Sequence, residues 1–155
     1  MDTQFSLRKV LIKDEKLILS WANDPVVRKG SFNHSVITEN EHHNWFINKL
    51  EDENVLMWIF EVNQKPSGLV RFEKSSKEKA VISYQIAKSS RGKKLASVML
   101  KLSIKELKKF WGDIKILAFT LPKNLASVKS LEKAGFKIIS KLKNQISLEY
   151  KNQAI

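Results

Sequence analysis

The chain has 155 residues, of which 43% are hydrophobic, and it contains no cysteine. This length and composition predict one folded domain over residues 1–155, and they exclude a disordered chain, a disulfide framework and a cysteine nucleophile. No apolar run is long enough to span a bilayer, and the first residues lack a secretion signal. We therefore expect a cytoplasmic protein with no membrane partner.

Positive charge gathers in the second part of the chain. Residues 1–90 hold 13 Lys and Arg against 12 Asp and Glu, whereas residues 91–155 hold 15 against 4. This asymmetry favours a polyanionic partner, which is a nucleic acid, a membrane surface or a phosphorylated cofactor. Because nearly all of these charges are lysine, a solvated surface explains them equally well.

The hydrophobic pattern of the first half predicts strands and helices joined by recognisable turns. A capping box at Thr38–Glu41 begins a helix, and the breaker-rich turn Asn63–Gly68 makes the strands beside it antiparallel. The expected elements are a strand at Gln4–Leu11, helices at Glu15–Ala22 and from Thr38–Glu41 to about Leu50, and strands at Val55–Val62 and Leu69–Glu73.

The second half continues the same alternation and completes an α/β fold. Its expected elements are a strand at Ala80–Ala87, a long helix to about Trp111, a strand at Ile114–Leu121, a helix at Asn124–Ala134, and strands at Phe136–Leu142 and Gln145–Tyr150. Together the two halves predict a mixed sheet of about seven strands with helices on both faces.

The stretch Ser90–Ala96, which reads Ser-Arg-Gly-Lys-Lys-Leu-Ala, joins the strand Ala80–Ala87 to the long amphipathic helix. A strand that runs through such a loop into a helix exposes free backbone N–H groups at the positive end of the helix dipole. That arrangement is a seat for a phosphate or pyrophosphate. Many α/β loops, however, carry a glycine for packing reasons alone.

A second segment, Asn124–Phe136, resembles the N-x-x-S…K-x-G-F signature of the GNAT-type (Gcn5-related) N-acetyltransferases. The loop Arg91–Ala96 resembles the R-x-x-G-x-A acetyl-CoA loop of the same family, and the two motifs stand in the family's order. The resemblance implies an acetyl-CoA-dependent enzyme with a single GNAT-type domain. Its sheet would splay into a V that holds acetyl-CoA between the strands Ala80–Ala87 and Ile114–Leu121.

The resemblance also implies the residues that bind acetyl-CoA. Backbone amides of the loop would hold the pyrophosphate, and strand-end main chain would pair with the pantetheine arm, which two polar residues would also contact. The implied residues are Ile86, Ala87, Arg91, Gly92, Lys93, Lys94, Leu95, Ala96, Asn124 and Ser127. Independently of function, Asn124 makes a good helix N-cap, Ser127 is an ordinary first-turn residue, and Gly135 suits a helix C-terminus with positive φ.

The chain departs from the family pattern at two positions. Lys94 stands where the loop usually has glycine, and its side chain either narrows the approach to the pyrophosphate or contacts a phosphate. Leu131 stands where many members carry a tyrosine that protonates the departing CoA thiolate. Because a free thiol has a pKa of ~8.5, its thiolate is a tolerable leaving group that water can protonate.

The segment Trp21–Phe46 resembles the amino-terminal part of bacterial acetyltransferases that act on UDP-linked 4-amino-6-deoxy sugars of pseudaminic- and legionaminic-type pathways. It implies that the acceptor is the 4-amino group of a nucleotide-linked amino sugar in surface-glycan biosynthesis. Ribosomal-protein or peptide N-termini and aminoglycosides are alternative acceptors. The expected substrate-binding residues are Trp21, Asn23, Arg28, Phe32 and His42, with Arg28 facing a diphosphate. We expect Trp45 and Phe46 to pack in the core.

Direct transfer requires a neutral amine, and four ionisable residues are candidates for the proton transfers. They are His42, Glu61, Glu73 and Tyr84. His42 titrates nearest to neutral pH, although a helix-face histidine can equally well pack or cap. Three histidines without cysteine or clustered carboxylates predict no metal site.

Two other classes of protein are compatible with the residues. A basic nucleic-acid-binding module would use the lysine-rich helix Lys93–Lys109 against phosphates. No recognition motif for bases accompanies it, so we expect no nucleic acid as partner. A non-catalytic acetyl-CoA-binding protein would tolerate Lys94 and Leu131. A homodimer is an open alternative to a monomer.

Overall fold

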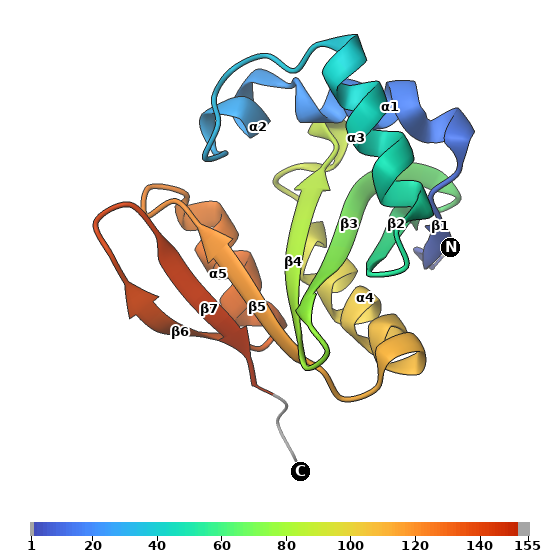
Figure 1. The fold of residues 1–155 in the computed structure, drawn as a ribbon. Coiled ribbons are helices and arrows are strands. Elements are labelled where there is room, and N and C mark those ends of the chain that lie inside the picture. The colour runs from blue at the N-terminus through green and yellow to red at the C-terminus, as the bar shows by residue number, and fades with distance from the viewer. Residues whose placement is uncertain (1, 152–155) are drawn as a thin grey trace.

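The computed structural model describes residues 2–151, which form one seven-stranded sheet with helices on both faces (Figure 1). The strand order is β1-β2-β3-β4-β5-β7-β6. Every neighbouring pair is antiparallel except β4 with β5, which is parallel. The strands are β1 (Phe5–Lys9), β2 (Val55–Val62), β3 (Lys65–Ser76), β4 (Lys79–Ile86), β5 (Lys115–Thr120), β6 (Phe136–Lys141) and β7 (Ile146–Tyr150).

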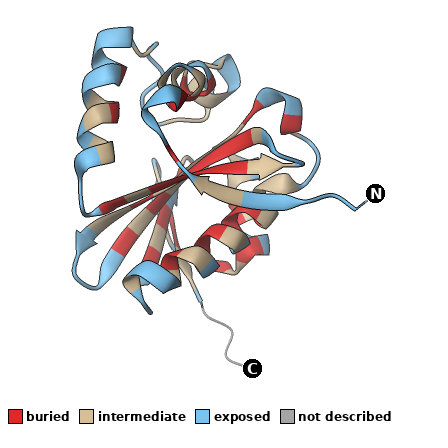
Figure 2. Ribbon diagram, turned by 90° about the vertical axis from the view of Figure 1, so that its right-hand side faces the viewer, coloured by how far each residue is buried: buried red, intermediate tan, exposed pale blue. Residues whose placement is uncertain are grey.

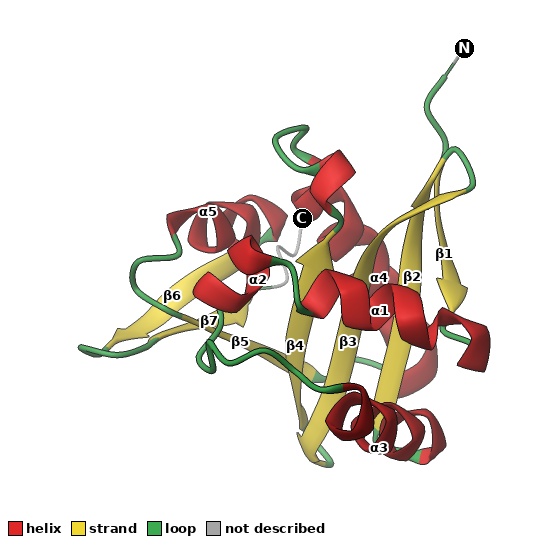
Figure 3. Cartoon of the chain, turned by 90° about the horizontal axis from the view of Figure 1, so that it is seen from above, coloured by secondary structure: helices red, strands yellow, loops and turns green. Residues whose placement is uncertain are grey.

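The helices lie on both faces of the sheet, which confirms the predicted α/β class. They are α1 (Glu15–Ala22), α2 (Pro25–Lys29), α3 (Glu39–Glu51), α4 (Leu95–Trp111) and α5 (Leu125–Ala134), with short 3-10 turns at η1 (Ile12–Asp14) and η2 (Lys88–Ser90). Seen from above, α1 and α3 lie on one side of β1–β4 and α4 lies on the other (Figure 3). None of these helices within residues 2–151 is long and apolar enough to cross a membrane.

Each face of the sheet has its own hydrophobic core, because side chains alternate along a strand. On β2, Trp58 and Phe60 join the cluster that packs on α4 and α5, whereas Met57 and Ile59 join the cluster under α1 and α3. Phe46 of α3 is fully buried in the second cluster, as predicted. The buried residues accordingly lie along the strands and the inner helix faces (Figure 2).

The pairing of β4 with β5 covers only the first half of β4. Their register runs from Lys79 with Lys115 to Ile82 with Ala118. Beyond that point β4 continues beside β3 to Ile86, and β5 pairs with β7 alone. The two strands therefore part, and α2 lies above the opening between them (Figures 1 and 3).

The sequence prediction was wrong about the start of β3, which begins at Lys65 rather than Leu69. The turn before it consists of Asn63 and Gln64, both with positive φ, and such two-residue turns join hairpin strands directly. Pro66 stands inside the strand opposite Glu61, where the register between β2 and β3 shifts. A proline is tolerated at such an irregularity because the ladder hydrogen bond is already interrupted there.

The short helix α2 was not predicted from the sequence. The sequence predicted one helix that ends at Ala22 and no further element before the helix that begins at Thr38–Glu41. In the structure, Pro25 occupies the first turn of α2, and the Asp24 side chain accepts a hydrogen bond from the N–H of Val26. Proline and aspartate at these positions favour a helix start.

We expect Gly68→Ala to destabilise the fold, because a Cβ at this position of β3 has no room. It would lie 2.8 Å from the Gln85 carbonyl oxygen and 2.9 Å from the Met99 sulfur. Overpacking of this kind costs about 1–3 kcal/mol in the free energy of unfolding. Denaturant unfolding measures the change, with Ser75→Ala at an exposed position of the same strand as control. An unchanged midpoint for Gly68→Ala would contradict the packing described here.

Candidate active site

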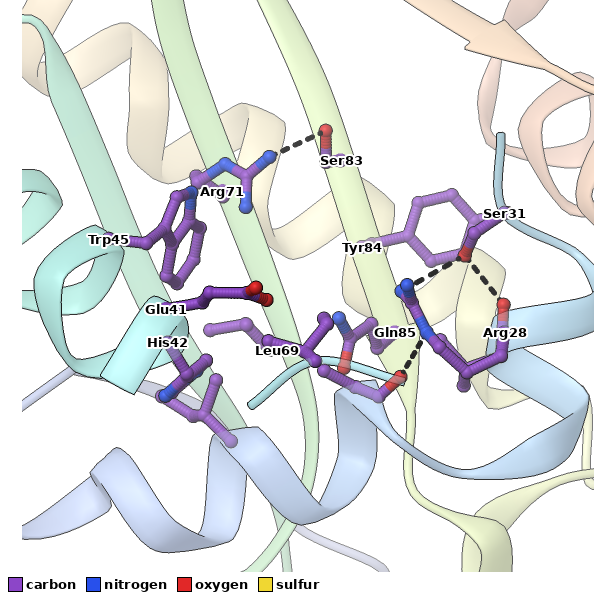
Figure 4. Close-up of a pocket in the computed structure, with 14 residues that line it drawn as sticks. Arg28, Ser31, Glu41, His42, Trp45, Leu69, Arg71, Ser83, Tyr84 and Gln85 are labelled. Carbon is purple, nitrogen blue, oxygen red and sulfur yellow. Dashed lines mark hydrogen bonds between the residues drawn. The ribbon is translucent and has the colours of Figure 1, made fainter. Parts of the chain in front are cut away.

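Two cavities meet beside the open end of β4. One, of about 520 Å³, lies between α1, α2, α3 and the strands β3 and β4 (Figure 4). The other, of about 470 Å³, lies between β4, the start of α4 and the start of α5. We call them the acceptor cavity and the cofactor cavity. Both are of the size that binds small molecules.

The start of α4 makes the floor of the cofactor cavity suitable for a pyrophosphate. Gly92 has φ 76°, and a Cβ built there would meet nothing within 4 Å. Lys94, the N-cap residue of α4, has left-handed backbone angles and gives the helix no side-chain cap. The first amides of the helix are therefore not capped by that side chain, and they lie at the positive end of the helix dipole. The family's preference for glycine at this position matches the left-handed conformation, which Lys94 adopts at a steric cost.

The strand edge of the cofactor cavity comes from β4 beyond its pairing with β5. The N–H of Ala87 donates to the Ser67 carbonyl at 2.8 Å, and the Ala87 carbonyl accepts from the Ser90 N–H at 2.8 Å. Peptide groups alternate in direction along an antiparallel strand, so those of Ile86 and Tyr84 face away from β3 and toward the opening. The backbone groups of Ile86 thus face the opening, whereas the N–H and the carbonyl of Ala87 already have hydrogen-bond partners within the chain. The pantetheine contacts assigned to both residues stay predictions.

Two polar residues tie the cofactor cavity to α2. Asn124 caps α5 by accepting from the Ser127 N–H at 3.2 Å, and its amide lies 3.4 Å from the Gly30 carbonyl at the end of α2. Arg91 donates to Asp24 at 3.1 Å, and Asp24 caps the start of α2. Residues near both ends of α2 are therefore held by residues that the sequence analysis assigned to acetyl-CoA.

Most of the predicted cofactor residues come together in this cavity. Its lining includes Ile86, Arg91, Gly92, Lys94, Leu95, Ala96, Asn124 and Ser127. Ala87 and Lys93 lie outside the lining. Lys93 is exposed on the surface of the loop.

The wall of the acceptor cavity carries a cation that the sequence analysis did not single out. The Arg71 guanidinium of β3 lies 4.9 Å from the centre of the Trp45 ring and donates to Ser83 Oγ at 3.3 Å (Figure 4). Its Nε is 2.8 Å from a Glu73 carboxylate oxygen but is out of line for a hydrogen bond. Burial lowers the pKa of Arg71, which still remains a cation at any working pH.

His42 lies in the wall of the same cavity, on α3. Its residue surface is 3% exposed, and neither ring nitrogen has a hydrogen-bond partner. The ring lies between Trp45 and Phe46, at centroid distances of 5.5 and 5.8 Å. Burial lowers the pKa of His42, so the imidazole is neutral near pH 7 and able to accept a proton.

Glu41 and Trp45 of α3 also line the acceptor cavity, and sequence reasoning missed both as site residues. The Glu41 carboxylate points into the cavity (Figure 4). Its position directly before His42 was the available signal. Trp45 was expected in the core, but one face of its ring is covered by Arg71 at the cavity wall.

The two glutamates proposed as bases are engaged in ion pairs. Burial raises the pKa of Glu73, but the hydrogen bond from Lys49 and the charge of Arg71 outweigh this effect and hold the pKa below its usual range. A carboxylate in that state is a poor base. Glu61 accepts from Arg8 Nε at 3.2 Å, next to the pair of Arg8 with Asp14. Neither glutamate lines the acceptor cavity.

Arg28 does line the acceptor cavity, but its guanidinium holds the chain around it. It donates to the carbonyl oxygens of Ala22 at 2.7 Å, Asn33 at 2.9 Å and Ser35 at 3.3 Å. These bonds fix the loop that follows α2. The diphosphate contact assigned to Arg28 stays a prediction, and it would have to replace some of them.

The other expected substrate residues lie outside the acceptor cavity. The side chain of Asn23 pairs with both backbone groups of Ile37 at 2.8 Å. Trp21 is buried in the cluster under α1 and α3, and Phe32 is 56% exposed on the loop after α2. Two of these residues thus support the cavity, whereas Phe32 faces solvent.

Tyr84 is the one predicted catalytic candidate that lines both cavities. Its hydroxyl oxygen lies 2.9 Å from Ser127 Oγ, so it reaches from β4 across the opening to α5. Burial raises the pKa of Tyr84, and hydrogen bonds with Ser127 and Ser130 oppose that shift only in part. The phenol is therefore neutral at physiological pH.

The part of the chain that the structure describes, residues 2–151, contains no group of three or more His, Asp or Glu side chains that could hold a metal ion. The ionisable groups of the acceptor cavity are Arg28, Glu41, His42, Arg71 and Tyr84. Their arrangement suits proton transfer and charge recognition.

The cofactor cavity combines the start of α4 with the open edge of β4, and it shares one wall with the acceptor cavity. Two adjoining cavities of this kind suit an enzyme that moves a group between two bound molecules. The model of the Acetyltransferase (GNAT) domain family matches residues 4–137. The chain therefore belongs to this family and is an acetyl-CoA-dependent N-acetyltransferase of the GNAT type. When bound, acetyl-CoA supplies the activated acetyl group.

Solved structures of low sequence identity share the fold over nearly the whole chain. A domain from Methanocaldococcus jannaschii is 24% identical, with a TM-score of 0.82 over 96% of this chain and 98% of that one. The spermidine N-acetyltransferase of Vibrio cholerae, in complex with CoA and spermine, is 19% identical, with a TM-score of 0.83 over 94% and 93%. The aminoglycoside acetyltransferase AAC(6′)-Ib, in complex with paromomycin and acetyl-CoA, is 18% identical, with a TM-score of 0.81 over 96% and 94%. No curated protein sequence matched the chain.

We expect Lys94→Gly to raise the free energy of unfolding by about 1 kcal/mol, because glycine adopts the left-handed conformation without the Cβ clash. Lys93→Gly is the matched control, since φ is not positive there. It removes the same charge from the same loop but should lower stability by up to about 1 kcal/mol. Denaturant unfolding separates the two, and a loss of stability in both variants would contradict the assigned conformation.

Proposed function

We propose that the acceptor is a small amine that also carries an anionic group, and specifically the 4-amino group of a nucleotide-linked amino sugar used in surface-glycan biosynthesis. The observation that carries this proposal is the Arg71 guanidinium in the wall of the acceptor cavity. A guanidinium presents paired N–H donors whose planar geometry suits a phosphate or carboxylate. Ser83, beside it, adds a hydroxyl to the same wall.

The charge of the cavity argues against a polycationic acceptor. Its charged lining residues are Arg28, Glu41 and Arg71. Glu73, which pairs with Arg71, is shared with Lys49. A ligand with several ammonium groups needs several carboxylates to replace its hydration, and like charges oppose its entry. The acceptors named in the neighbouring complexes, spermine and an aminoglycoside, are polycations.

Other residues of the cavity give an amino sugar its remaining contacts. The Trp45 ring and the apolar side chains of Ile18 and Leu69 offer surface to a sugar ring. The Glu41 carboxylate, on the opposite side of the cavity from Arg28 in Figure 4, accepts from the Thr38 N–H at 3.4 Å through one oxygen and offers its other oxygen to an amine. One carboxylate and two guanidiniums lining the same cavity suit one amine on an otherwise anionic molecule.

His42 is our candidate for the base that takes the proton from the attacking amine. It is neutral at pH 7, lies in the cavity wall and has two unpartnered ring nitrogens. Both ring nitrogens are buried, so the proton reaches one of them, directly or through one water molecule, once the side chains around the ring move. The loss of the proton leaves the nitrogen lone pair free to attack.

Acceptor selectivity tests the proposal. We expect CoA release to be fastest, by kcat/KM, with a nucleotide-linked amino sugar, slower with a neutral amino glycoside, and slowest with spermidine or an aminoglycoside. Arg71→Gln should lower kcat/KM for the nucleotide sugar about ten- to a hundredfold, since it removes a charge-assisted hydrogen bond. Its effect on the neutral glycoside should be small.

The activity of Arg71→Gln with the neutral acceptor shows whether the variant has lost one contact or has a damaged cavity. Lys65→Gln, at an exposed position of the same strand, controls for the loss of a positive charge alone. Equal losses on both acceptors would show that Arg71 only supports the fold. A preference for spermidine, an aminoglycoside or a peptide N-terminus would overturn the anionic acceptor while leaving the acetyltransferase activity intact.

The role of His42 predicts a particular pH dependence. Because burial lowers its pKa, the basic form persists below the ordinary value of about 6.5. The acidic limb of kcat should therefore lie below pH 6.5. His42→Gln should lower kcat about 10²–10⁴-fold at pH 7.5 and abolish that limb. His43→Gln, on the same helix and exposed, is the control.

Stability should follow the same titration. The pKa of His42 is lower in the folded than in the unfolded chain, so the unfolded chain binds more protons below about pH 6.5. The contribution of neutral His42 to the free energy of unfolding is therefore complete above about pH 6.5, and it is lost as the pH falls through the pKa of His42 in the folded chain.

An unchanged acidic limb of kcat in His42→Gln would remove His42 from the role of base.

A further inference from the structure

The two cavities share only four lining residues, and these mark where the two substrates meet. They are Val27, Ser31, Tyr84 and Gln85. The amine enters from one cavity and the thioester from the other, so the bond between sulfur and acetyl carbon must break beside this shared wall. The side chains of this shared wall are therefore the first candidates to stabilise the leaving sulfur.

Among these four residues, the Tyr84 hydroxyl is the suitable donor. Ser31 Oγ, just after α2, already donates to the Val27 carbonyl. Val27 has no polar side-chain atom, and the Gln85 side chain is a weaker, neutral amide donor. Tyr84 Oη lies at the α5 side of the opening, held by Ser127 Oγ at 2.9 Å.

The neighbouring residues on α5 leave this role open for Tyr84. Leu131 is 1% exposed in the core against α4 and has no proton to offer. Ser127 and Ser130 line the cofactor cavity on the first turns of α5. The Tyr84 hydroxyl donates to the Ser127 carbonyl at 3.4 Å and lies 2.9 Å from Ser127 Oγ. The carbonyl bond is long and Ser127 Oγ can act as donor, so the phenol can redirect its O–H toward a ligand.

We infer that the Tyr84 hydroxyl donates a hydrogen bond to the CoA sulfur as the carbon–sulfur bond breaks, and that it stays protonated while doing so. A phenol is a weaker acid than a thiol, so it stabilises a thiolate without surrendering its proton. This role rests on the acetyltransferase activity and is independent of which amine is the acceptor.

The atoms of the step balance with Tyr84 unchanged. The amine nitrogen attacks the carbonyl carbon, and the electron pair of the carbon–sulfur bond leaves on sulfur. The amine proton passes to His42 and then to solvent, and the thiolate takes a proton from solvent. Tyr84 lowers the energy of the charge that develops on sulfur, as oriented donors do for oxyanions.

Titration of the thiol in the complex with CoA tests this inference without any acceptor. The ultraviolet absorbance of the thiolate reports its pKa, which is about 8.5 for a free thiol. A hydrogen bond to the charged form lowers that pKa. We expect the bound thiol to titrate about one unit or more lower in the native protein than in Tyr84→Phe. CoA affinity should change much less, because the ring remains.

Tyr150→Phe is the matched control, since the chain has only two tyrosines and Tyr150 lies at the end of β7 against Phe136. Turnover of any accepted amine should fall about ten- to a hundredfold in Tyr84→Phe and stay unchanged in Tyr150→Phe. Ser127→Ala should have a smaller effect, because it removes only the group that positions the phenol.

The outcomes separate this inference from the proposed acceptor. An equal thiol pKa in the native protein and in Tyr84→Phe overturns the role of Tyr84, whatever the acceptor is. A lowered thiol pKa that depends on Tyr84 supports the role even if no amino sugar is accepted. If Tyr84→Phe unfolds, Ser127→Ala measured in the same two ways decides between the outcomes.

Discussion

The ladder between β4 and β5 ends after Ile82 and Ala118, and the whole site depends on that early end. β4 stays in register with β3 to Ile86, so its far edge keeps peptide groups that no strand uses. The chain then turns through η2 into α4, which sets the helix start beside this edge. A longer ladder would satisfy those peptide groups and close the cofactor cavity beside them.

The short helix α2 connects the two substrate sites mechanically. Asp24 before its start is bonded to Arg91, and Gly30 at its end lies against Asn124. Arg28, within the helix, holds the loop that completes the acceptor cavity. A ligand that engages Arg91 or Asn124 competes with these bonds, so the position of α2 is linked to the state of the cofactor cavity. The polar residues predicted to bind acetyl-CoA thus also hold α2 in place.

The sequence predicted those elements whose signals are local. The capping box before α3, the strand β2 and the strand–loop–helix around Gly92 were placed within a residue or two, because hydrophobic period and capping chemistry depend on near neighbours. The start of β3 was missed because a proline is tolerated only where the partner strand is irregular. Side-chain roles were harder to predict. The residue types of Arg28 and Glu73 suggested chemistry, but Arg28 donates to the Asn33 carbonyl and Glu73 accepts from Lys49, which lies 24 residues away in the chain. These contacts already use the groups that the prediction assigned to substrate or catalysis.

The charge of the chain and the charge of the site have different origins. Residues 91–155 carry most of the net charge, yet Arg91 and Lys94 are their only cations in the lining of either cavity. Several of the other lysines lie over aromatic rings or beside carboxylates, as Lys108 does over Tyr150 and Lys115 beside Glu149. Exposed charges are screened over about 8 Å at physiological salt, whereas a half-buried guanidinium such as that of Arg71 is screened much less. Under the proposed function, the one arginine in the cavity wall therefore acts on the acceptor more directly than the exposed lysines, which act mainly on the approach of anionic ligands.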